Sequence, residues 1–324
     1  MNVLVTGGTG FLGAYVIAAL EAAGHAPLAY DIAPPSSEML FVAPTLASRF
    51  RPGQIGDIAR LFEVCRGAKI EAIVHAAGMV GLEQSLAQPL ATYQTNIMGL
   101  VHACEAAHRL GMRRLVAISS NAAYHKGTGE RLTETDPPFS VTAGNPAAHY
   151  GTSKMAGEAI GLAYATFQEV DFLALRITAI YGFGMRSPMY IKPMVENAVR
   201  GVPTRFATGG PMKRDYTHVL DCVDAILLAL NAPRLTTDEQ RVLNVAAGRA
   251  CTAAEVAATV RNIIPGAVIE IGDTLTPLEA ENVKMRAPLD IQAAKRVLGW
   301  SPKWPLADGI RQYAGRYRQY LAAT

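Results

Sequence analysis

A predicted strand, a glycine-rich turn and a predicted helix follow one another without a break at the start of the chain. Asn2–Thr6 is apolar enough for a short buried strand, and four glycines occur within residues 7–13. Apolar residues then recur at helical spacing up to Ala23, where Gly24 offers a helix end. This order of elements predicts an α/β fold in which the turn binds a phosphate-bearing ligand.

Three of the glycines have separate physical tasks in such a turn. Gly7 permits the tight turn after the strand, Gly10 leaves room for a pyrophosphate beside the backbone, and Gly13 lets the helix lie close to the sheet. The first helical turn begins with Phe11 and Leu12. Its free N–H groups and partial positive charge favour a bound phosphate.

A second apolar run ends in an acidic residue, Asp31, about 18 residues after Gly13. Its carboxylate could accept hydrogen bonds from both hydroxyls of an adenosine ribose, and it would repel a 2′-phosphate. The sequence therefore predicts NAD, rather than NADP, as the cofactor. The alternative is an ordinary strand, turn and helix with incidental glycines.

Further apolar runs alternate with helical segments through the first half of the chain. Predicted strands cover residues 50–55, 71–75, 114–119 and 171–177. Such alternation predicts a Rossmann-type, doubly wound parallel sheet with helices on both faces. Ligands of such sheets bind at the carboxyl ends of the strands.

Two segments that follow these strands are candidates for cofactor contacts. Asp57 could accept a hydrogen bond from an adenine amino group, or it could cap a helix over residues 59–66, and both interpretations stay open. Ala76, Ala77 and Gly78 are small enough for a cofactor phosphate and ribose to pass close to the backbone.

The alternation breaks after residue 182. We expect a small, discontinuous lobe over the open end of the sheet, because loops and short elements follow without a linker or an internal repeat. The predicted NAD-binding domain comprises residues 1–182, with 216–247 and about 289–304 returning to it. The predicted substrate-binding lobe comprises residues 183–215, 248–288 and 305–324.

Tyr150 and Lys154 are four residues apart in a predicted helix over 149–168, and they therefore lie on one face of it. A free phenol has a pKa of about 10 and is a poor base at neutral pH. The charges of Lys154 and an oxidised nicotinamide would lower the pKa of Tyr150, so that the phenolate could accept a proton from a carbinol. Ser120, at a strand end, could hydrogen-bond the same substrate oxygen.

The chain resembles the extended short-chain dehydrogenases/reductases, the group that includes the NAD-dependent sugar epimerases and dehydratases. The resemblance extends through residues 7–13, Asp31, 56–58, 75–77, 80–99, 119–120, 150–154, Arg176, 181–182, 214–219, 244–245 and 294–300. It implies that Tyr150 is the base and Lys154 its partner. It also implies that Ser120 stabilises the substrate oxygen and that Asn96 supports the active-site helix.

The motifs and this resemblance together give the candidate site residues. The expected cofactor contacts are Gly7, Gly10, Phe11, Leu12, Gly13, Asp31, Asp57, Ile58, Ala76, Ala77, Gly78, Asn96, Tyr150 and Lys154. The expected substrate contacts are Ser85, Ser120, Asn121, Arg186 and Arg214. By resemblance, the helices over 89–110 and 149–168 would pair with their copies in a homodimer.

One departure from the family pattern concerns the substrate. Nucleotide-sugar members commonly have an asparagine three residues after the arginine of the sixth strand, where it meets the substrate diphosphate. Ala179 stands at this place here, which argues against a nucleotide-sugar substrate. Arg214 and Arg286 could hold a carboxylate or phosphate instead, or form salt bridges with Asp215 and Asp290.

Composition excludes several other classes of protein. The formal charge is +3, from 30 basic and 27 acidic residues spread along the chain, so we expect no nucleic-acid partner. The four cysteines are far apart and indicate neither a metal site nor a disulfide framework. No apolar run is long enough to predict a membrane span, and we expect a cytoplasmic protein.

These features predict an NAD-dependent oxidoreductase that moves a hydride at a secondary alcohol or ketone of a small, polar, sugar-derived compound. The alternative is an epimerase, which would use the same three residues and return the hydride to the other face of the ketone. A dehydratase is disfavoured, because Asn121 and Ala122 occupy the place of the usual acid–base pair. A non-catalytic redox sensor is disfavoured because Tyr150 and Lys154 are both retained.

Overall fold

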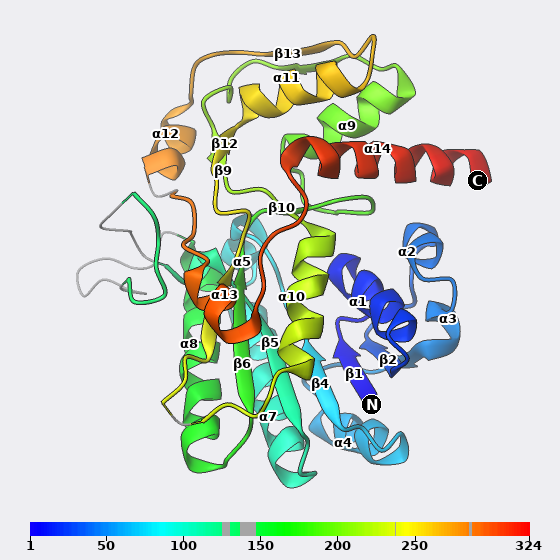
Figure 1. Cartoon of the computed structure of the whole chain (residues 1–324), viewed down its shortest axis with the longest axis vertical. Coiled ribbons are helices and arrows are strands. Elements are labelled where there is room, and N and C mark those ends of the chain that lie inside the picture. The colour runs from blue at the N-terminus through cyan, green and yellow to red at the C-terminus, as the bar shows by residue number, and fades with distance from the viewer. Residues whose placement is uncertain (125–129, 137–146, 237, 285–286) are drawn as a thin grey trace.

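The computed structural model describes residues 1–124, 130–136, 147–236, 238–284 and 287–324. Within these ranges, seven parallel strands form one sheet in the order β11-β6-β5-β4-β1-β2-β3 (Figure 1). The strands are β1 (Asn2–Thr6), β2 (Ala26–Asp31), β3 (Phe50–Pro52), β4 (Ala72–His75), β5 (Arg114–Ser120), β6 (Phe172–Ile177) and β11 (Val242–Val245). The predicted Rossmann-type parallel sheet is confirmed.

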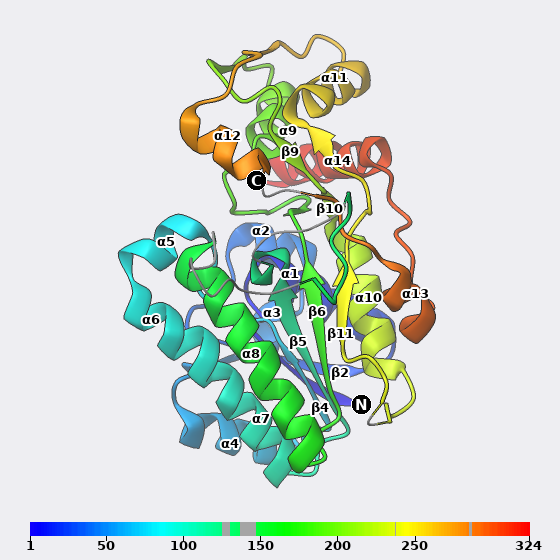
Figure 2. The ribbon, with the colours of Figure 1, turned by 90° about the vertical axis from the view of Figure 1, so that its left-hand side faces the viewer.

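Helices cover both faces of the sheet (Figure 2). One face packs against α1 (Phe11–Ala22), α10 (Val219–Asn231) and α13 (Gln292–Leu298). The other packs against α4 (Ile58–Gly67), α7 (Gly99–Arg109) and α8 (Ala148–Phe167). Successive residues of β1 alternate between the two apolar clusters, because neighbouring side chains of a strand point to opposite faces.

The sequence predicted one helix over residues 89–110, but the structure divides this stretch into segments of different helix type. After α5 (Leu82–Ala87), it consists of α6 (Pro89–Tyr93), a π-helical segment η1 (Gln94–Met98) and α7. The wider π turn contains Asn96, which is buried and donates a hydrogen bond to Ser153 of α8. The local change of helix type therefore coincides with a polar contact between neighbouring helices.

One predicted element boundary was wrong, and one segment held helices that were not predicted. The strand predicted over residues 50–55 ends at Pro52, because its partner β2 ends at Asp31 and leaves no backbone to pair with. The segment that follows Asp31 leads into α2 (Ser37–Val42) and α3 (Leu46–Arg49), for which the sequence analysis predicted no element. Both short helices lie beside α1 (Figure 1).

A separate group of elements lies beyond the carboxyl ends of the strands (Figure 1). It comprises α9 (Ile191–Arg200), β8 (Thr204–Phe206), β9 (Lys213–Arg214), β12 (Cys251–Thr252), α11 (Ala253–Ile263), β13 (Ile269–Ile271), α12 (Pro277–Lys284) and α14 (Leu306–Ala323). Most of these elements contribute to an apolar cluster of their own, which also includes Tyr181. The strands β7 (Ile180–Tyr181) and β10 (Thr217–His218) pair with each other. The exact division into two domains stays a prediction.

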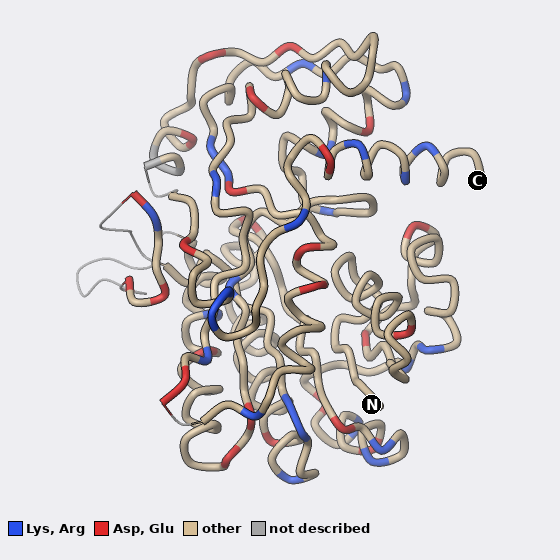
Figure 3. The backbone as a smooth tube through the Cα atoms, in the orientation of Figure 1, with Lys and Arg blue, Asp and Glu red and all other residues tan. Residues whose placement is uncertain are grey.

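Charged residues of both signs are interspersed along the sheet and the lobe (Figure 3). No described helix is long and apolar enough to cross a membrane. Among the described side chains, no group of three or more His, Cys, Asp or Glu residues is arranged to hold a metal ion.

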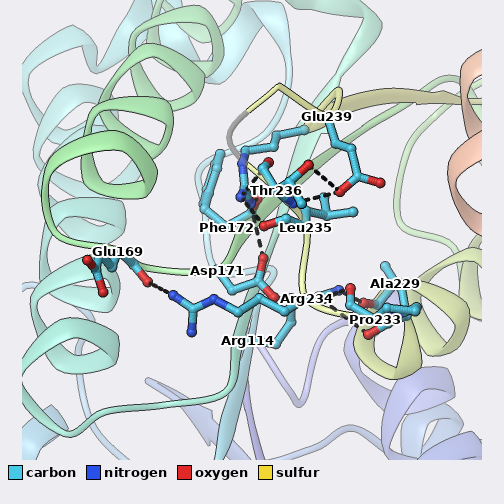
Figure 4. Close-up of polar contacts among 12 residues, drawn as sticks. Arg114, Glu169, Asp171, Phe172, Ala229, Pro233, Arg234, Leu235, Thr236 and Glu239 are labelled. Carbon is cyan, nitrogen blue, oxygen red and sulfur yellow. Dashed lines mark hydrogen bonds and ion pairs between the residues drawn. The ribbon is translucent and has the colours of Figure 1, made fainter.

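A buried ion cluster fixes the amino-terminal end of β6 (Figure 4). Asp171 accepts hydrogen bonds from Arg114, on β5, and from Arg241, just before β11. The Asp171 and Arg114 side chains are only 2% and 1% exposed. Arg114 also donates to the backbone carbonyls of Ala229 and Pro233 at the end of α10. Asp171 therefore links the neighbouring strands β5, β6 and β11, and Arg114 links them to the end of α10.

We predict that Asp171→Asn lowers the free energy of unfolding by about 3 kcal/mol, because it leaves two arginines without their buried counter-charge. Denaturant unfolding of the variant and the parent measures this loss. The matched control is Glu270→Gln, which removes an ion pair with Arg205 whose side chains are more than 60% exposed. The control should change stability by less than about 1 kcal/mol. Equal losses in both variants would contradict the interpretation.

Candidate active site

The glycine turn after β1 lies against the end of β4. Gly7 has a positive φ of 69°, and a Cβ atom there would be 2.8 Å from the backbone of Ala76 and Ala77. A Cβ at Gly13 would collide with the carbonyl oxygen of Gly7. The N-cap residue of α1, Gly10, has no side chain to cap the helix, and the first turn of α1 contains no acidic residue. Backbone N–H groups at this helix end can therefore receive an anion.

Asp31 is held at the end of β2 by the glycine turn itself. Its Oδ2 accepts hydrogen bonds from the backbone N–H and the hydroxyl of Thr9, at 3.1 and 2.7 Å. Its Oδ1 accepts from the backbone N–H of Ile32 at 2.7 Å. The Thr9 hydroxyl also lies 3.0 Å from the Ala33 carbonyl oxygen, to which it could donate instead. The carboxylate could then accept two further hydrogen bonds, as the ribose interpretation requires.

We predict that Asp31→Ala weakens NAD binding by roughly tenfold or more, because a charge-assisted hydrogen bond contributes about 1.5–3 kcal/mol. It should also reduce the discrimination against NADP, since the negative charge that repels a 2′-phosphate is gone. Equilibrium binding of both nucleotides measures the two effects. An unchanged preference for NAD would contradict the assignment of Asp31.

Asp57 provides a matched control for this experiment. Its Oδ1 accepts a hydrogen bond from the Arg60 backbone N–H, so Asp57 does cap α4. The carboxylate is exposed and has free lone pairs, and the proposed contact with adenine stays a prediction, as does that of the neighbouring Ile58. Asp57→Ala should lower stability by about 1 kcal/mol without changing the preference between NAD and NADP.

Asn96 connects the segment after β4 to helix α8. Its side-chain amide donates to the carbonyl oxygen of Met79 and to the hydroxyl of Ser153, while its Oδ1 accepts from the Met79 N–H. A Cβ at Gly78 would lie 3.1 Å from the Asn96 side chain and 3.7 Å from Lys154 Nζ. The small residues after β4 therefore border both the glycine turn and Lys154, and these contacts support the predicted role of Asn96.

The structure brings the three predicted catalytic residues together. Lys154 Nζ lies 5.9 Å from the ring centroid of Tyr150 and donates a hydrogen bond to the carbonyl oxygen of Ile118 at 2.7 Å. Ser120, two residues after Ile118, forms a side-chain hydrogen bond with Tyr150. Two elements, α8 and the end of β5, therefore meet around one phenol. His149, the residue before Tyr150, is instead hydrogen-bonded to Tyr93.

Burial shifts the pKa values of both Tyr150 and Lys154 in the protein alone. It raises the pKa of Tyr150, an effect that the hydrogen bond from Ser120 partly opposes. It lowers the pKa of Lys154 to about 8, which the charge of Glu158 partly opposes. The expected fall in the pKa of Tyr150 is therefore not a property of the protein alone. It requires the further positive charge of an oxidised nicotinamide.

Burial keeps a histidine near Lys154 neutral. Burial and, secondarily, the charge of Lys154 lower the pKa of His75 to about 3, and its Nδ1 is hydrogen-bonded to the Thr6 hydroxyl. His75 is therefore neutral near pH 7.

The predicted substrate residues differ in burial and in their contacts. Ser85 is buried and donates its hydroxyl proton to the Leu82 carbonyl, whereas Arg186 is exposed in the loop before α9. Asn121 lies beside Ser120, whose hydroxyl is 3.4 Å from its Oδ1. Arg286 lies outside the described residues.

Arg214 is the strongest of these candidates for an anionic substrate group. It donates to the Lys213 carbonyl, and within the described ranges it forms no ion pair with Asp215 or Asp290, the alternative that the sequence left open. Burial partly desolvates the guanidinium and lowers its pKa, and no carboxylate among the described residues pairs with it. Ala179 has a positive φ of 36° and no polar side chain with which to contact a substrate.

The model of the NAD dependent epimerase/dehydratase family matches residues 3–246. The chain belongs to this family. A UDP-glucose 4-epimerase from Lacticaseibacillus casei is 26% identical over 335 residues, covering 98% of this chain and 97% of that protein. One from Mycolicibacterium smegmatis is 29% identical, covering 98% and 99%.

Solved structures of family members agree with the fold. The structure of a Thermus thermophilus UDP-glucose 4-epimerase in complex with NAD matches with a TM-score of 0.81 and 25% identity, covering 98% of this chain and 99% of that chain. The prediction of an NAD-dependent enzyme of the extended epimerase/dehydratase type is confirmed, and NAD is the family's cofactor. Three features of the chain fit this cofactor: the glycine turn, the amino-terminal end of α1 and the Asp31 carboxylate.

Sequence reasoning missed three residues that shape this site. Thr9 fixes Asp31, and Ser119 and Glu158 contact each other behind Lys154. Glu158 could have been found, because Tyr150, Lys154 and Glu158 recur at intervals of four and therefore share a helix face.

Proposed function

We propose that this protein oxidises a secondary alcohol of a small, sugar-derived substrate, or reduces the corresponding ketone, with Tyr150 as the general base and acid. The observation that carries the proposal is the meeting of Tyr150, Lys154 and Ser120 beside the segment that borders the glycine turn. The cofactor, when bound, would supply the hydride chemistry: its oxidised form would take a hydride from the carbinol carbon, and its reduced form would give one to the ketone.

Side chains of this protein accept and donate the proton of the substrate hydroxyl. In the oxidation direction, Tyr150 Oη accepts the proton of the substrate hydroxyl, and in reduction it donates that proton back. Protonated Lys154 favours the phenolate through its charge, and Ser120 donates a hydrogen bond that lowers the cost of negative charge on oxygen. Because the pKa of Lys154 is about 8, its charge is present below that pH and is lost above it.

We propose that residues 7–13, the end of α1 and Asp31 hold the nucleotide, and that Lys154 holds the nicotinamide ribose. Arg214 is the proposed contact for an anionic substrate group, since it is partly desolvated and has no carboxylate partner among the described residues. Ser85, Asn121 and Arg186 are proposed as further substrate contacts.

Epimerisation of a nucleotide-sugar is a second candidate function. It is favoured by relatives that are described as UDP-glucose 4-epimerases and that align over nearly the whole chain. It would use the same three residues and would not consume NAD. Ala179 weighs against it, because no side-chain amide is available there.

One assay separates the two functions. The protein is incubated with NAD and a panel of sugars, sugar acids, hydroxy acids and UDP-sugars, while absorbance at about 340 nm and product isomers are recorded. Net formation of NADH supports the dehydrogenase, and isomers without NADH support the epimerase. Neither product from any compound of the panel would contradict the proposal.

We propose a homodimer formed through α6, η1, α7 and α8. Large apolar side chains on this surface are exposed, including Leu90 (69%) and Phe167 (77%). Size-exclusion chromatography with light-scattering detection should give a molar mass of twice 34.5 kDa, the mass of one chain. Leu90→Glu should shift the protein towards monomer, whereas Leu278→Glu, which changes an equally exposed leucine on α12, should not.

We also propose the cytoplasm as the protein's location. The four cysteines are free and buried, which supports a reducing compartment.

A further inference from the structure

A buried carboxylate lies one helical turn beyond Lys154. Glu158 follows Lys154 by four residues on α8, and its side chain is only 6% exposed. Its Oε1 accepts hydrogen bonds from the Ser119 hydroxyl at 2.5 Å and from Arg176 Nε at 2.9 Å. Its Oε2 accepts from Arg176 Nη2 at 2.6 Å. Ser119 immediately precedes Ser120, so this carboxylate connects the helix of Tyr150 to the strand end of Ser120.

Arg176 extends the same contacts across the sheet. Its guanidinium lies 4.4 Å from the ring centroid of Tyr124, which follows β5. The Tyr124 hydroxyl donates to Asn244 of β11 at 2.7 Å. Glu158 and Arg176 therefore link α8 to β5, β6 and β11, all at the carboxyl end of the sheet.

A small cavity of about 20 Å³ lies beside Glu158 and Lys154. Its lining includes His75 of β4, Asn96 of η1, Ser119 of β5, and Ser153, Lys154 and Glu158 of α8. The volume suits a single water molecule. Lys154 and Glu158 consequently share one poorly hydrated space, in which charges interact more strongly than in bulk water.

We propose that Glu158 is a positioning residue for the catalytic group. Its carboxylate holds the Ser119–Ser120 strand end against the turn of α8 that carries Lys154, and it supplies the negative charge that keeps Lys154 protonated. This role rests on the proposed function, in which protonated Lys154 assists Tyr150. Arg176 limits the effect, because it places a positive charge on the other side of the same carboxylate.

The titratable groups around Lys154 determine in which direction each substitution should shift the pKa of Lys154. They are His75 from β4, Tyr150 and Glu158 from α8 and, behind Glu158, Arg176 from β6 with Tyr124. His75 is neutral near pH 7. Removing the charge of Glu158 should therefore lower the pKa of Lys154, and removing the charge of Arg176 should raise it.

The direct test is an NMR titration of the NAD-bound protein labelled with ¹³C at the lysine ε-carbons, with the Lys154 signal assigned from Lys154→Arg. We expect the Lys154 midpoint to fall by about one pH unit in Glu158→Gln, and to rise in Arg176→Gln. Asp171→Asn is the matched control, because Asp171 is an equally buried carboxylate paired with arginines at the opposite end of β6 (Figure 4). It should leave the midpoint unchanged.

Opposite shifts of the Lys154 midpoint in Glu158→Gln and Arg176→Gln support the proposal. Asp171→Asn also loses a buried ion pair, but only the first two variants change the charge near Lys154. Equal midpoints in Glu158→Gln and in Asp171→Asn would overturn it. Should Glu158→Gln fail to fold, Arg176→Gln decides alone, with an upward shift in favour and an unchanged midpoint against. The titration needs no substrate, so absence of turnover in the parent protein would contradict the proposed function without affecting this test.

Discussion

Tyr150→Phe should reduce turnover by roughly a thousandfold, since general acid–base catalysis by a positioned side chain contributes about 10²–10⁴-fold. Phenylalanine keeps the ring beside Lys154 but removes the oxygen that accepts the substrate proton. The nucleotide is proposed to be held mainly by the glycine turn and by Asp31, so the dissociation constant for NAD should change by less than about threefold. Turnover of the substrate found in the panel and equilibrium binding of NAD provide the two measurements.

The matched control is Tyr164→Phe, which removes a phenol farther along the same helix. The Tyr164 hydroxyl donates to Glu105, outside the proposed site, so turnover should stay close to that of the parent. Similar losses in both variants would indicate a general effect on α8. Undiminished turnover in Tyr150→Phe would remove Tyr150 from the mechanism.

Gly13→Ala should have the second large effect, on both stability and NAD binding. The added Cβ would collide with the carbonyl oxygen of Gly7 and would come 2.7 Å from the Cα of Gly8. Both are backbone atoms, so α1 would have to move away from β1 or the turn would have to open. We expect a loss of about 3 kcal/mol in the free energy of unfolding. NAD affinity should fall at least about tenfold, because the turn no longer keeps its shape.

Gly315→Ala is the control for this substitution. Gly315 lies within α14, and a Cβ there would meet no atom within 4 Å. Alanine should therefore stabilise the protein by about 0.5–1 kcal/mol through the lower entropy of the unfolded chain. Denaturant unfolding with and without NAD compares the two variants. If Gly13→Ala were as stable as Gly315→Ala, close packing would not explain this glycine.

The parts of the molecule that local sequence determines were predicted correctly. The strand, turn and helix at residues 2–22 are encoded by neighbouring residues, since a positive φ at Gly7 and helical spacing after Phe11 need no information from elsewhere. The same holds for Tyr150 and Lys154, whose spacing places them on one helix face. The parallel sheet followed from the alternation of strands and helices.

Contacts between distant segments could not be predicted in this way. Asp171 meets Arg114 and Arg241 across 57 and 70 residues, and neither spacing has a local signature. The π turn at Asn96 coincides with hydrogen bonds to Ser153 and Met79, which only the folded chain brings near. Burial also determines that the pKa of Tyr150 rises in the protein alone, and a sequence does not specify burial of an individual phenol.

A crystal structure of the protein with bound NAD tests the central claim most directly. We predict that the pyrophosphate lies against residues 7–13 and that the nicotinamide ribose lies within hydrogen-bonding distance of Lys154 Nζ and the Tyr150 hydroxyl. A nicotinamide bound away from both side chains would contradict the proposed chemistry, even with the nucleotide seated on the glycine turn.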